Sequence, residues 1–166
     1  MKKRLLYFLL LFSSVLNAQT YPNQNISLLG LIDPNTGTTT IGPDGRKYNG
    51  CWGWYQTSLN KEYAIVGASH GTYFIDVSIP TTPSVSAFVP GRTNVTVREI
   101  KTYQNYCYIT CDEGGTNTFQ IVDMSTLPAT VTLVHNSNSL FERGHTQWIN
   151  QDKLYIGGVT YSNTTA

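Results

Sequence analysis

From Tyr48 onward, short apolar runs alternate with polar, turn-forming residues. The runs are rich in Val, Ile, Tyr, Phe and Thr and are bounded by Gly, Pro, Asn or Asp, which is the pattern of β-strands joined by turns. The candidate strands are residues 51–57, 62–68, 72–78, 85–90, 97–103, 106–111, 118–124, 131–136, 145–150 and 153–159. No apolar stripe of useful length has the 3.6-residue period of a helix. The pattern therefore predicts an all-β chain.

The strand pattern repeats along the chain. The pattern of the stretch EYAIVGASHGTYFIDVSIPTTP recurs in YCYITCDEGGTNTFQIVDMSTLP, and a third copy begins at HTQWINQDKLYIGG. Asp123 follows Asp76 by 47 residues. A unit of about four strands that repeats at this length is typical of a β-propeller blade, which needs neighbours to bury both of its faces. We predict a β-propeller-like array of about two and a half to three four-stranded blades over residues 48–166.

This array is too short to close on itself, because propellers close with about four to eight blades. The final residues, GGVTYSNTTA, follow a strand directly. We therefore expect a truncated chain that is part of a larger propeller, with assembly from several chains or an open sheet sandwich as the alternatives. An unclosed array would leave an apolar blade face and strand edges exposed.

The first 47 residues precede the repeats. Lys2, Lys3 and Arg4 come before a short apolar run, and Ala18 follows it, which predicts a secretory signal peptide over residues 1–18 and an exported protein without a transmembrane segment. An uncleaved N-terminal anchor is the alternative. Residues 19–47 are rich in turn formers and predict a leader loop with one strand at ISLLGLI, residues 26–32.

Composition narrows the classes of function. The net charge is +1 and only 13% of residues are charged, so no broad basic surface for nucleic acid is predicted. Cys107 and Cys111 lie four residues apart in one predicted strand and would be about 13 Å apart, too far for a disulfide. Any disulfide must therefore include Cys51, and the alternative is three small buried residues.

Several motifs occur in the order found in a known family. They are NGCWGW, EYAIVGASHGTYFIDVSIPTTP, VREIKTYQNYCYITCDEG, FQIVDMSTLP and RGHTQWI. Together they resemble the choice-of-anchor B family of exported bacterial proteins, frequent in the Bacteroidetes, which are built on propeller-like LVIVD repeats. The resemblance covers roughly residues 45–160 and implies an exported, surface-associated repeat protein. Family members are usually longer and many end in a sorting or anchoring segment; the resemblance implies no established reaction and no catalytic residue.

Polar residues near the start of each unit are the candidates for chemistry. Aligning the apolar strands places Cys51, Glu99 and His145 at matching positions, and the first strand of a propeller blade lines the central channel. A thiolate, a carboxylate and an imidazole in one ring could hold a divalent metal ion, Ca²⁺ or Zn²⁺. Arg98 and Arg143 flank this ring and could hold an anion or pair with Glu99. The alternative is that all five are channel-lining polar groups, and a one-residue shift of the alignment would turn alternate side chains to the other face.

Four acidic residues have simpler interpretations. Asp76 and Asp123 end equivalent strands, and we expect a structural role in which each carboxylate accepts hydrogen bonds from the following turn. A ligand or ion contact is the alternative for both. Asp112 and Glu113 lie in a strand-to-strand turn and predict an exposed acidic hairpin, with a Ca²⁺ contact as the alternative.

No local catalytic motif is present: the chain contains no G-x-S-x-G, H-E-x-x-H, P-loop or G-x-G-x-x-G. Its aromatic residues suggest either sugar binding or packing between blades. The relevant residues are Trp52, Trp54, Tyr55, Tyr103 and Trp148. We predict a non-catalytic binding module at the cell surface whose partner is an extracellular protein or glycan. The alternative is a metal-dependent extracellular hydrolase with its site at the propeller channel.

Overall fold

The computed structural model describes residues 25–35, 41–113, 115 and 119–161, which form ten strands and no helix. The strands are β1 (Tyr48–Gln56), β2 (Lys61–Ala68), β3 (Gly71–Asp76), β4 (Ser84–Pro90), β5 (Arg98–Tyr103), β6 (Tyr106–Cys111), β7 (Phe119–Asp123), β8 (Thr132–Ser137), β9 (Thr146–Asn150) and β10 (Lys153–Gly157). Each predicted run overlaps one of them.

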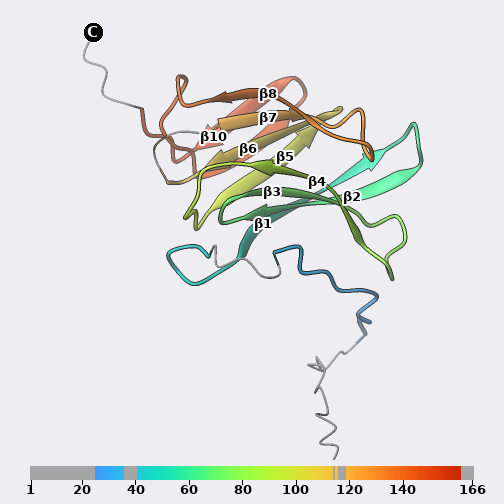
Figure 1. Cartoon of the computed structure of the whole chain (residues 1–166). Helices are drawn as coiled ribbons and strands as arrows, with labels where there is room; N and C mark the ends of the chain where they lie inside the picture. The colour runs from blue at the N-terminus through green and yellow to red at the C-terminus, as the bar shows by residue number, and fades with distance from the viewer. Residues whose placement is uncertain (1–24, 36–40, 114, 116–118, 162–166) are drawn as a thin grey trace, which may run out of the picture.

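The strands form three antiparallel sheets in chain order. β1–β4 and β5–β8 are four-stranded sheets, and β9 and β10 pair as a hairpin. Figure 1 shows the sheets stacked, with β1 at the bottom and β8 near the top. The prediction of an all-β, propeller-like array of four-stranded blades is confirmed.

The leader differs from the prediction. Among the described residues before β1, none lies in a strand, so the strand predicted at residues 26–32 is wrong. This segment contacts the first sheet through side chains, with Ile32 packed against the small cluster formed by Ala68, Tyr73 and Ile75. A Cβ on Gly30 would lie 2.3 Å from the carbonyl oxygen of Pro80, so backbone packs directly on backbone there. The predicted signal peptide, residues 1–18, lies outside the described residues.

The two four-stranded sheets end their third strands in the same way. Asp76 accepts a hydrogen bond from the backbone N–H of Ser78 at 2.9 Å, and Asp123 accepts one from Ser125 at 2.8 Å. An aspartate that accepts the N–H two residues on closes a turn without a further partner. These contacts repeat with the unit, which is what a structural role requires.

The first hairpin is longer than the second. Tyr63 and Tyr106 lie opposite the two aspartates and so mark equivalent positions. The β1–β2 ladder continues two pairs beyond Tyr63, to Gln56, before the turn at residues 57–60. In β5–β6, Tyr106 already belongs to the last pair, and the turn is residues 104–105. The first hairpin therefore overhangs the second at this edge.

The main core lies between the two four-stranded sheets. It contains Trp54, Tyr63, Ile65, Phe74 and Val89 from the first sheet, Ile100, Cys107, Ile109 and Val122 from the second, and Met124 and Leu127 after β7. Full burial of one such side chain contributes about 1.5–3 kcal/mol. Because this core draws on both sheets, each sheet depends on the other for its stability.

The inner strands approach each other closely at two glycines. A Cβ on Gly50 would lie 2.2 Å from the carbonyl oxygen of Arg98, and a Cβ on Gly67 would lie 2.6 Å from Oδ1 of Asn49. Contacts this short leave no room for any side chain. Glycine at position 50 therefore lets β1 and β5 pack backbone to backbone, while Gly67 in β2 leaves room for the Asn49 side chain and for Arg98.

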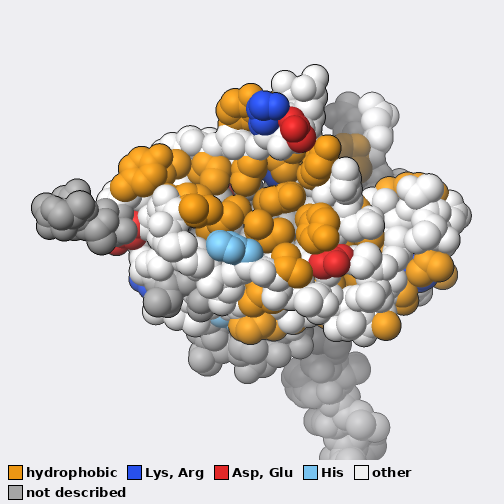
Figure 2. All heavy atoms as spheres, turned by 90° about the horizontal axis from the view of Figure 1, so that it is seen from above, with side chains coloured by type: hydrophobic (Ala, Val, Ile, Leu, Met, Phe, Trp, Pro, Cys, Tyr) orange, Lys and Arg blue, Asp and Glu red, His pale blue; other side chains and the backbone are white. Residues whose placement is uncertain are grey.

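The β8 end of the stack carries an apolar surface. Figure 2, the view onto this end, shows hydrophobic side chains gathered across it. Large exposed hydrophobic residues of β8, β9 and β10 are Leu133, Val134, Trp148 and Tyr155. Patches of this kind mark interaction surfaces or uncovered packing faces. None of the residues that the structure describes belongs to a helix able to cross a membrane.

Candidate functional site

The first strands of the three sheets lie side by side: β5 contacts β1 on one side and β9 on the other. This arrangement brings the polar candidates from the starts of the units onto adjacent strands. Whether these residues stand opposite one another depends on the register of each hairpin. Residues at equivalent positions in the register lie at the same level along the strands.

The register separates Cys51 from Glu99. Cys51 pairs with Val66 of β2. The position equivalent to Val66 in β6 is Ile109, and Ile109 pairs with Ile100. Ile100 is therefore the counterpart of Cys51, and Glu99 lies one residue before it. Since neighbouring strand residues point to opposite faces, Cys51 and Glu99 face different sides of their sheets.

His145 lies at another level. It stands three residues before Trp148, which pairs with Tyr155. In the second sheet the equivalent tyrosine, Tyr108, pairs with the residue three beyond Arg98. His145 is therefore the counterpart of Arg98, so the three predicted ligands occupy three successive levels.

The predicted ring of metal ligands is not assembled in this arrangement. Across the part of the chain that the structure describes, no group of three or more His, Cys, Asp or Glu side chains is placed to hold a metal ion. Glu99 instead accepts a hydrogen bond from Lys101, and Nδ1 of His145 lies 2.9 Å from Oδ2 of Asp112. The Cys51 thiol is exposed and is not in a disulfide.

Arg98 joins the two sheets. Its side chain is only 1% exposed. Nε donates to the carbonyl oxygen of Ala68 at 3.1 Å, and Nη2 donates to that of Arg92 at 2.7 Å. Burial lowers the pKa of Arg98, because removal from water disfavours the charged form. A guanidinium held this way is structural and cannot reach a ligand.

Arg143 also lies away from Glu99. Its Nε donates to Oγ1 of Thr160 at 3.0 Å, while the carboxylate of Glu99 is bonded to Lys101. Neither Arg98 nor Arg143 forms the ion pair with Glu99 that the sequence suggested. The flanking arginines therefore stabilise local structure in this arrangement.

The acidic turn after β6 is also bonded within the chain. Oδ2 of Asp112 contacts His145, and Oε1 of Glu113 accepts the backbone N–H of Thr96 at 2.6 Å. These contacts tie the turn to the residue before β9 and to the segment before β5. The carboxylates of Asp112 and Glu113 thus have structural partners.

The buried cysteines are poor nucleophiles. Cys107 and Cys111 are buried in β6, and neither is in a disulfide. Burial raises the pKa of Cys111 to about 11. The thiol is therefore protonated at neutral pH, and only the thiolate is reactive.

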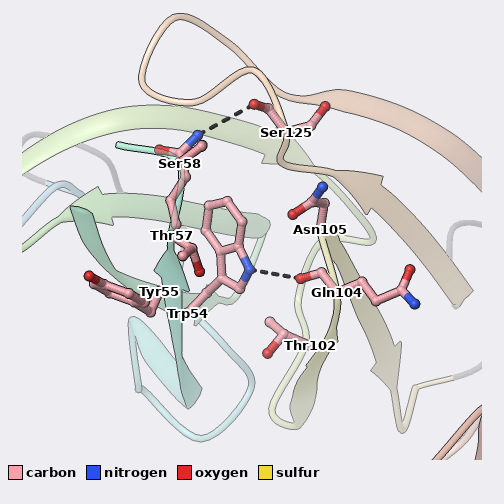
Figure 3. A pocket seen from close by; sticks show the side chains of 9 residues that line it. Trp54, Tyr55, Thr57, Ser58, Thr102, Gln104, Asn105 and Ser125 are labelled. Atoms are coloured by element: carbon pink, nitrogen blue, oxygen red, sulfur yellow. Dashed lines mark hydrogen bonds between the residues drawn. The ribbon is translucent and has the colours of Figure 1, made fainter. Parts of the chain in front are cut away.

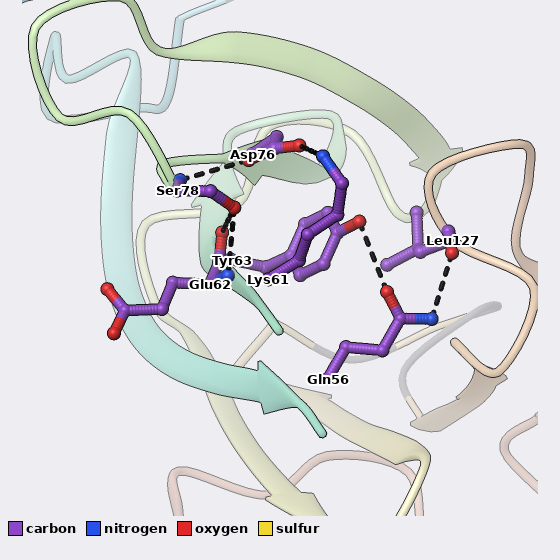
Figure 4. A network of polar contacts seen from close by, with 7 residues as sticks. All are labelled: Gln56, Lys61, Glu62, Tyr63, Asp76, Ser78 and Leu127. Carbon is purple, nitrogen blue, oxygen red and sulfur yellow. Dashed lines mark hydrogen bonds and ion pairs between the residues drawn. The ribbon is translucent and has the colours of Figure 1, made fainter. Parts of the chain in front are cut away.

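Asp76 forms an ion pair at one end of the first sheet and is held by two partners. Figure 4 shows Lys61 and Ser78 converging on its carboxylate. Burial disfavours the ionised form, but the hydrogen bonds from Lys61 and Ser78 outweigh burial and hold the pKa of Asp76 below its ordinary value of 3.8. The folded state therefore favours the charged carboxylate.

Asp76 should make stability depend on acid pH. Because its folded pKa is depressed, its contribution is fully present above the unfolded pKa of about 3.8 and is lost as the pH falls through the folded value. We expect Asp76→Asn to cost about 1 kcal/mol or less at neutral pH, since solvent weakens the pair, and to flatten the acid limb of the stability curve. Urea unfolding across a pH series measures both effects.

Asp152→Asn is the matched control, because this carboxylate is 74% exposed and pairs with its sequence neighbour Lys153. It should leave the stability at neutral pH and the acid limb nearly unchanged. The prediction would be contradicted if the free energy of unfolding of Asp76→Asn fell as steeply with decreasing pH as that of the unaltered chain.

A groove opens where the first hairpin overhangs the second. Its volume is about 550 Å³. The lining residues are Trp54, Tyr55, Gln56, Thr57, Ser58, Thr102, Gln104, Asn105 and Ser125. Figure 3 shows the Trp54 indole in the middle of this set, between the β1–β2 turn and the β5–β6 turn. Apart from the phenol of Tyr55, no lining side chain is ionisable.

Hydrogen bonds between the sheets fix the walls of this groove. Nε1 of Trp54 donates to the carbonyl oxygen of Gln104 at 2.8 Å. Nε2 of Gln56 donates to the carbonyl oxygens of Leu127 at 2.9 Å and Ser125 at 3.4 Å. The groove therefore exists only when both sheets are in place.

Sequence reasoning named Trp54 and Tyr55 as aromatic candidates but missed the rest of the groove. Apart from Gln56 in β1 and Thr102 in β5, its polar residues lie in two turns and after β7, where Thr, Ser, Gln and Asn are ordinary turn formers. The unequal lengths of the two hairpins are the signal that could have pointed to an overhang.

No protein-family model matches this chain, and no curated protein sequence or solved structure matches it either.

Proposed function

We propose that the protein is an exported, cell-surface-associated β-propeller repeat protein that acts as a non-catalytic binding module. One observation carries this proposal: the charged groups at the starts of the sheets are bonded within the chain, while an uncharged groove opens between the sheets. Arg98 binds carbonyl oxygens, Glu99 binds Lys101, and His145 binds Asp112.

The chemistry of the groove suits binding better than turnover. General acid–base catalysis needs a carboxylate, imidazole, amine or thiol within hydrogen-bond reach of the substrate. The groove lining consists of hydroxyls, amides and aromatic rings. Such groups orient a ligand and exclude water, but at neutral pH they do not transfer protons readily.

The predicted signal peptide and the resemblance to LVIVD-repeat proteins support a location outside the cell. The partner would be an extracellular protein or glycan, and the net charge of +1 argues against nucleic acid. The proposal requires no metal ion or other cofactor.

The alternative, a metal-dependent extracellular hydrolase, would need Cys51, Glu99 and His145 to converge on one ion. Their register places them at three levels. The alternative therefore predicts a rearrangement of the inner strands on metal binding.

The purified full chain decides between the two functions. We expect no turnover of chromogenic ester, peptide or glycoside substrates with Zn²⁺, with Ca²⁺ or with a chelator. The His145→Ala variant should show the same lack of turnover under all three conditions. A metal-dependent activity that disappears in His145→Ala but persists in His135→Ala would establish the hydrolase and overturn the binding module.

A further inference from the structure

We propose that the groove between the first two sheets binds an uncharged saccharide, with the ring of Tyr55 as the surface on which a sugar ring packs and the indole of Trp54 as the floor of the groove. This inference rests on the proposed binding function and names its ligand class. The residues that carry it come from both sheets, so the site belongs to the assembled array.

The rim of the groove matches the surface of a neutral sugar. Its polar side chains are those of Thr57, Ser58, Thr102, Gln104, Asn105 and Ser125. Hydroxyl and amide groups both donate and accept hydrogen bonds, which is what the hydroxyl groups of a saccharide require. A charged ligand would find no opposite charge on this lining and would lose hydration without compensation.

Trp54 and Tyr55 supply the aromatic part of the lining, with Trp54 at its floor. Figure 3 shows the Trp54 indole at the centre of the lining, and 9% of the residue remains exposed. Its only donor, Nε1, is already bonded to the carbonyl oxygen of Gln104 at 2.8 Å. The rest of the indole is buried in the core against Tyr63, so Trp54 forms the floor of the groove. Tyr55 lines the same groove and is half exposed, and its ring is the surface that suits the C–H face of a sugar.

The groove is held ready for a ligand. Besides the Trp54 bond, Gln56 is fixed to Leu127 at 2.9 Å, and the backbone N–H of Met124 donates to the carbonyl oxygen of Asn105 at 2.8 Å. Binding would order few protein groups, and a preorganised site avoids that entropic cost. A volume of about 550 Å³ falls within the usual range for small-ligand sites.

A second groove lets the ligand extend beyond one ring. Its volume is about 500 Å³, and Tyr55 borders both grooves. Tyr55 is 50% exposed, so part of its surface is accessible to solvent. Glu62 brings a carboxylate to the second groove, so the argument for an uncharged ligand applies to the first groove.

The test uses Trp54 as its own reporter. The chain has three tryptophans, so Trp52→Phe with Trp148→Phe leaves Trp54 as the sole one. This variant is titrated with cello-, xylo-, laminari- and manno-hexaose, and with an acidic oligogalacturonide. We expect a saturable change in Trp54 emission with at least one neutral hexaose, the same at low and high salt, and no change with the acidic oligomer.

A pair of variants locates the binding. Ser125→Arg places a long charged side chain at the rim and should weaken binding by about tenfold or more. Ala129→Arg adds the same side chain to an exposed position in the same loop that does not line the groove, and should leave binding unchanged. Unfolding curves of both variants verify that the fold is retained.

Each outcome has one meaning. No saturable response to any neutral hexaose, or binding that Ser125→Arg leaves intact, overturns the saccharide site. A change in Trp54 emission with the acidic oligogalacturonide alone also overturns the proposal of an uncharged saccharide. If the hexaoses do not bind and no substrate is turned over, only this inference fails and the binding module stands. Release of new reducing ends from a bound hexaose would instead overturn the non-catalytic function.

Discussion

Ile65→Ala should remove a large part of the stability of the protein. Ile65 is fully buried in the core between the first two sheets, against residues of both. Truncating a buried isoleucine costs about 2–5 kcal/mol, and we expect the upper part of this range because two hydrogen-bonded sheets cannot collapse into the space. A domain is stable by only about 5–15 kcal/mol, so the midpoint of urea unfolding should fall sharply.

Ile79→Ala is the matched control, because Ile79 is 65% exposed in the turn after β3. It removes the same atoms and should change the free energy of unfolding by about 0.5 kcal/mol or less. Equal losses in the two variants would show that the cavity between the sheets is not what destabilises Ile65→Ala.

Arg98→Lys should destabilise the protein although the charge is retained. The guanidinium donates to two carbonyl oxygens through separate nitrogens, Nε to Ala68 and Nη2 to Arg92. A lysine ammonium is a single point that cannot reproduce this fork. One carbonyl would be left without its donor in a buried place, so we expect a loss of about 2 kcal/mol in urea unfolding.

Arg143→Lys provides the comparison. Arg143 donates to Thr160 at a site exposed to solvent, and exposed contacts of this kind contribute little. This substitution should leave the free energy of unfolding within about 0.5 kcal/mol of the unaltered chain. An Arg98→Lys variant as stable as Arg143→Lys would mean that the two carbonyl contacts are dispensable.

The strands were predictable because their signals are local. Alternation and turn residues identify a strand within a few positions, and all the runs from Tyr48 onward correspond to strands. The segment at residues 26–32 has equally apolar residues but no strand beside it with which to form a ladder. A strand forms there only if another strand pairs with the segment, and that cannot be predicted from the residues of the segment alone.

The site was harder to predict because it depends on register. The apolar runs of the first strands can be aligned on each other, but the first hairpin has two extra pairs and a longer turn than the second. This difference shifts the alignment by a residue and separates Cys51 from Glu99. The groove at Trp54 results from the same difference in length. The displacement of His145 from Glu99 has another origin, because β9–β10 and β5–β6 have turns of equal length.

The close approach at Gly50 and Gly67 has a geometric consequence. A side chain at Gly50 would act as a wedge between the inner strands β1 and β5, because it would meet the Arg98 carbonyl oxygen, and a side chain at Gly67 in β2 would press on Asn49 and Arg98. Successive sheets would then be splayed at their inner ends, and the angular step from one sheet to the next would change. In a radial array that step determines how many sheets fill a full turn. Two residues without side chains thus help to set the angle between successive sheets.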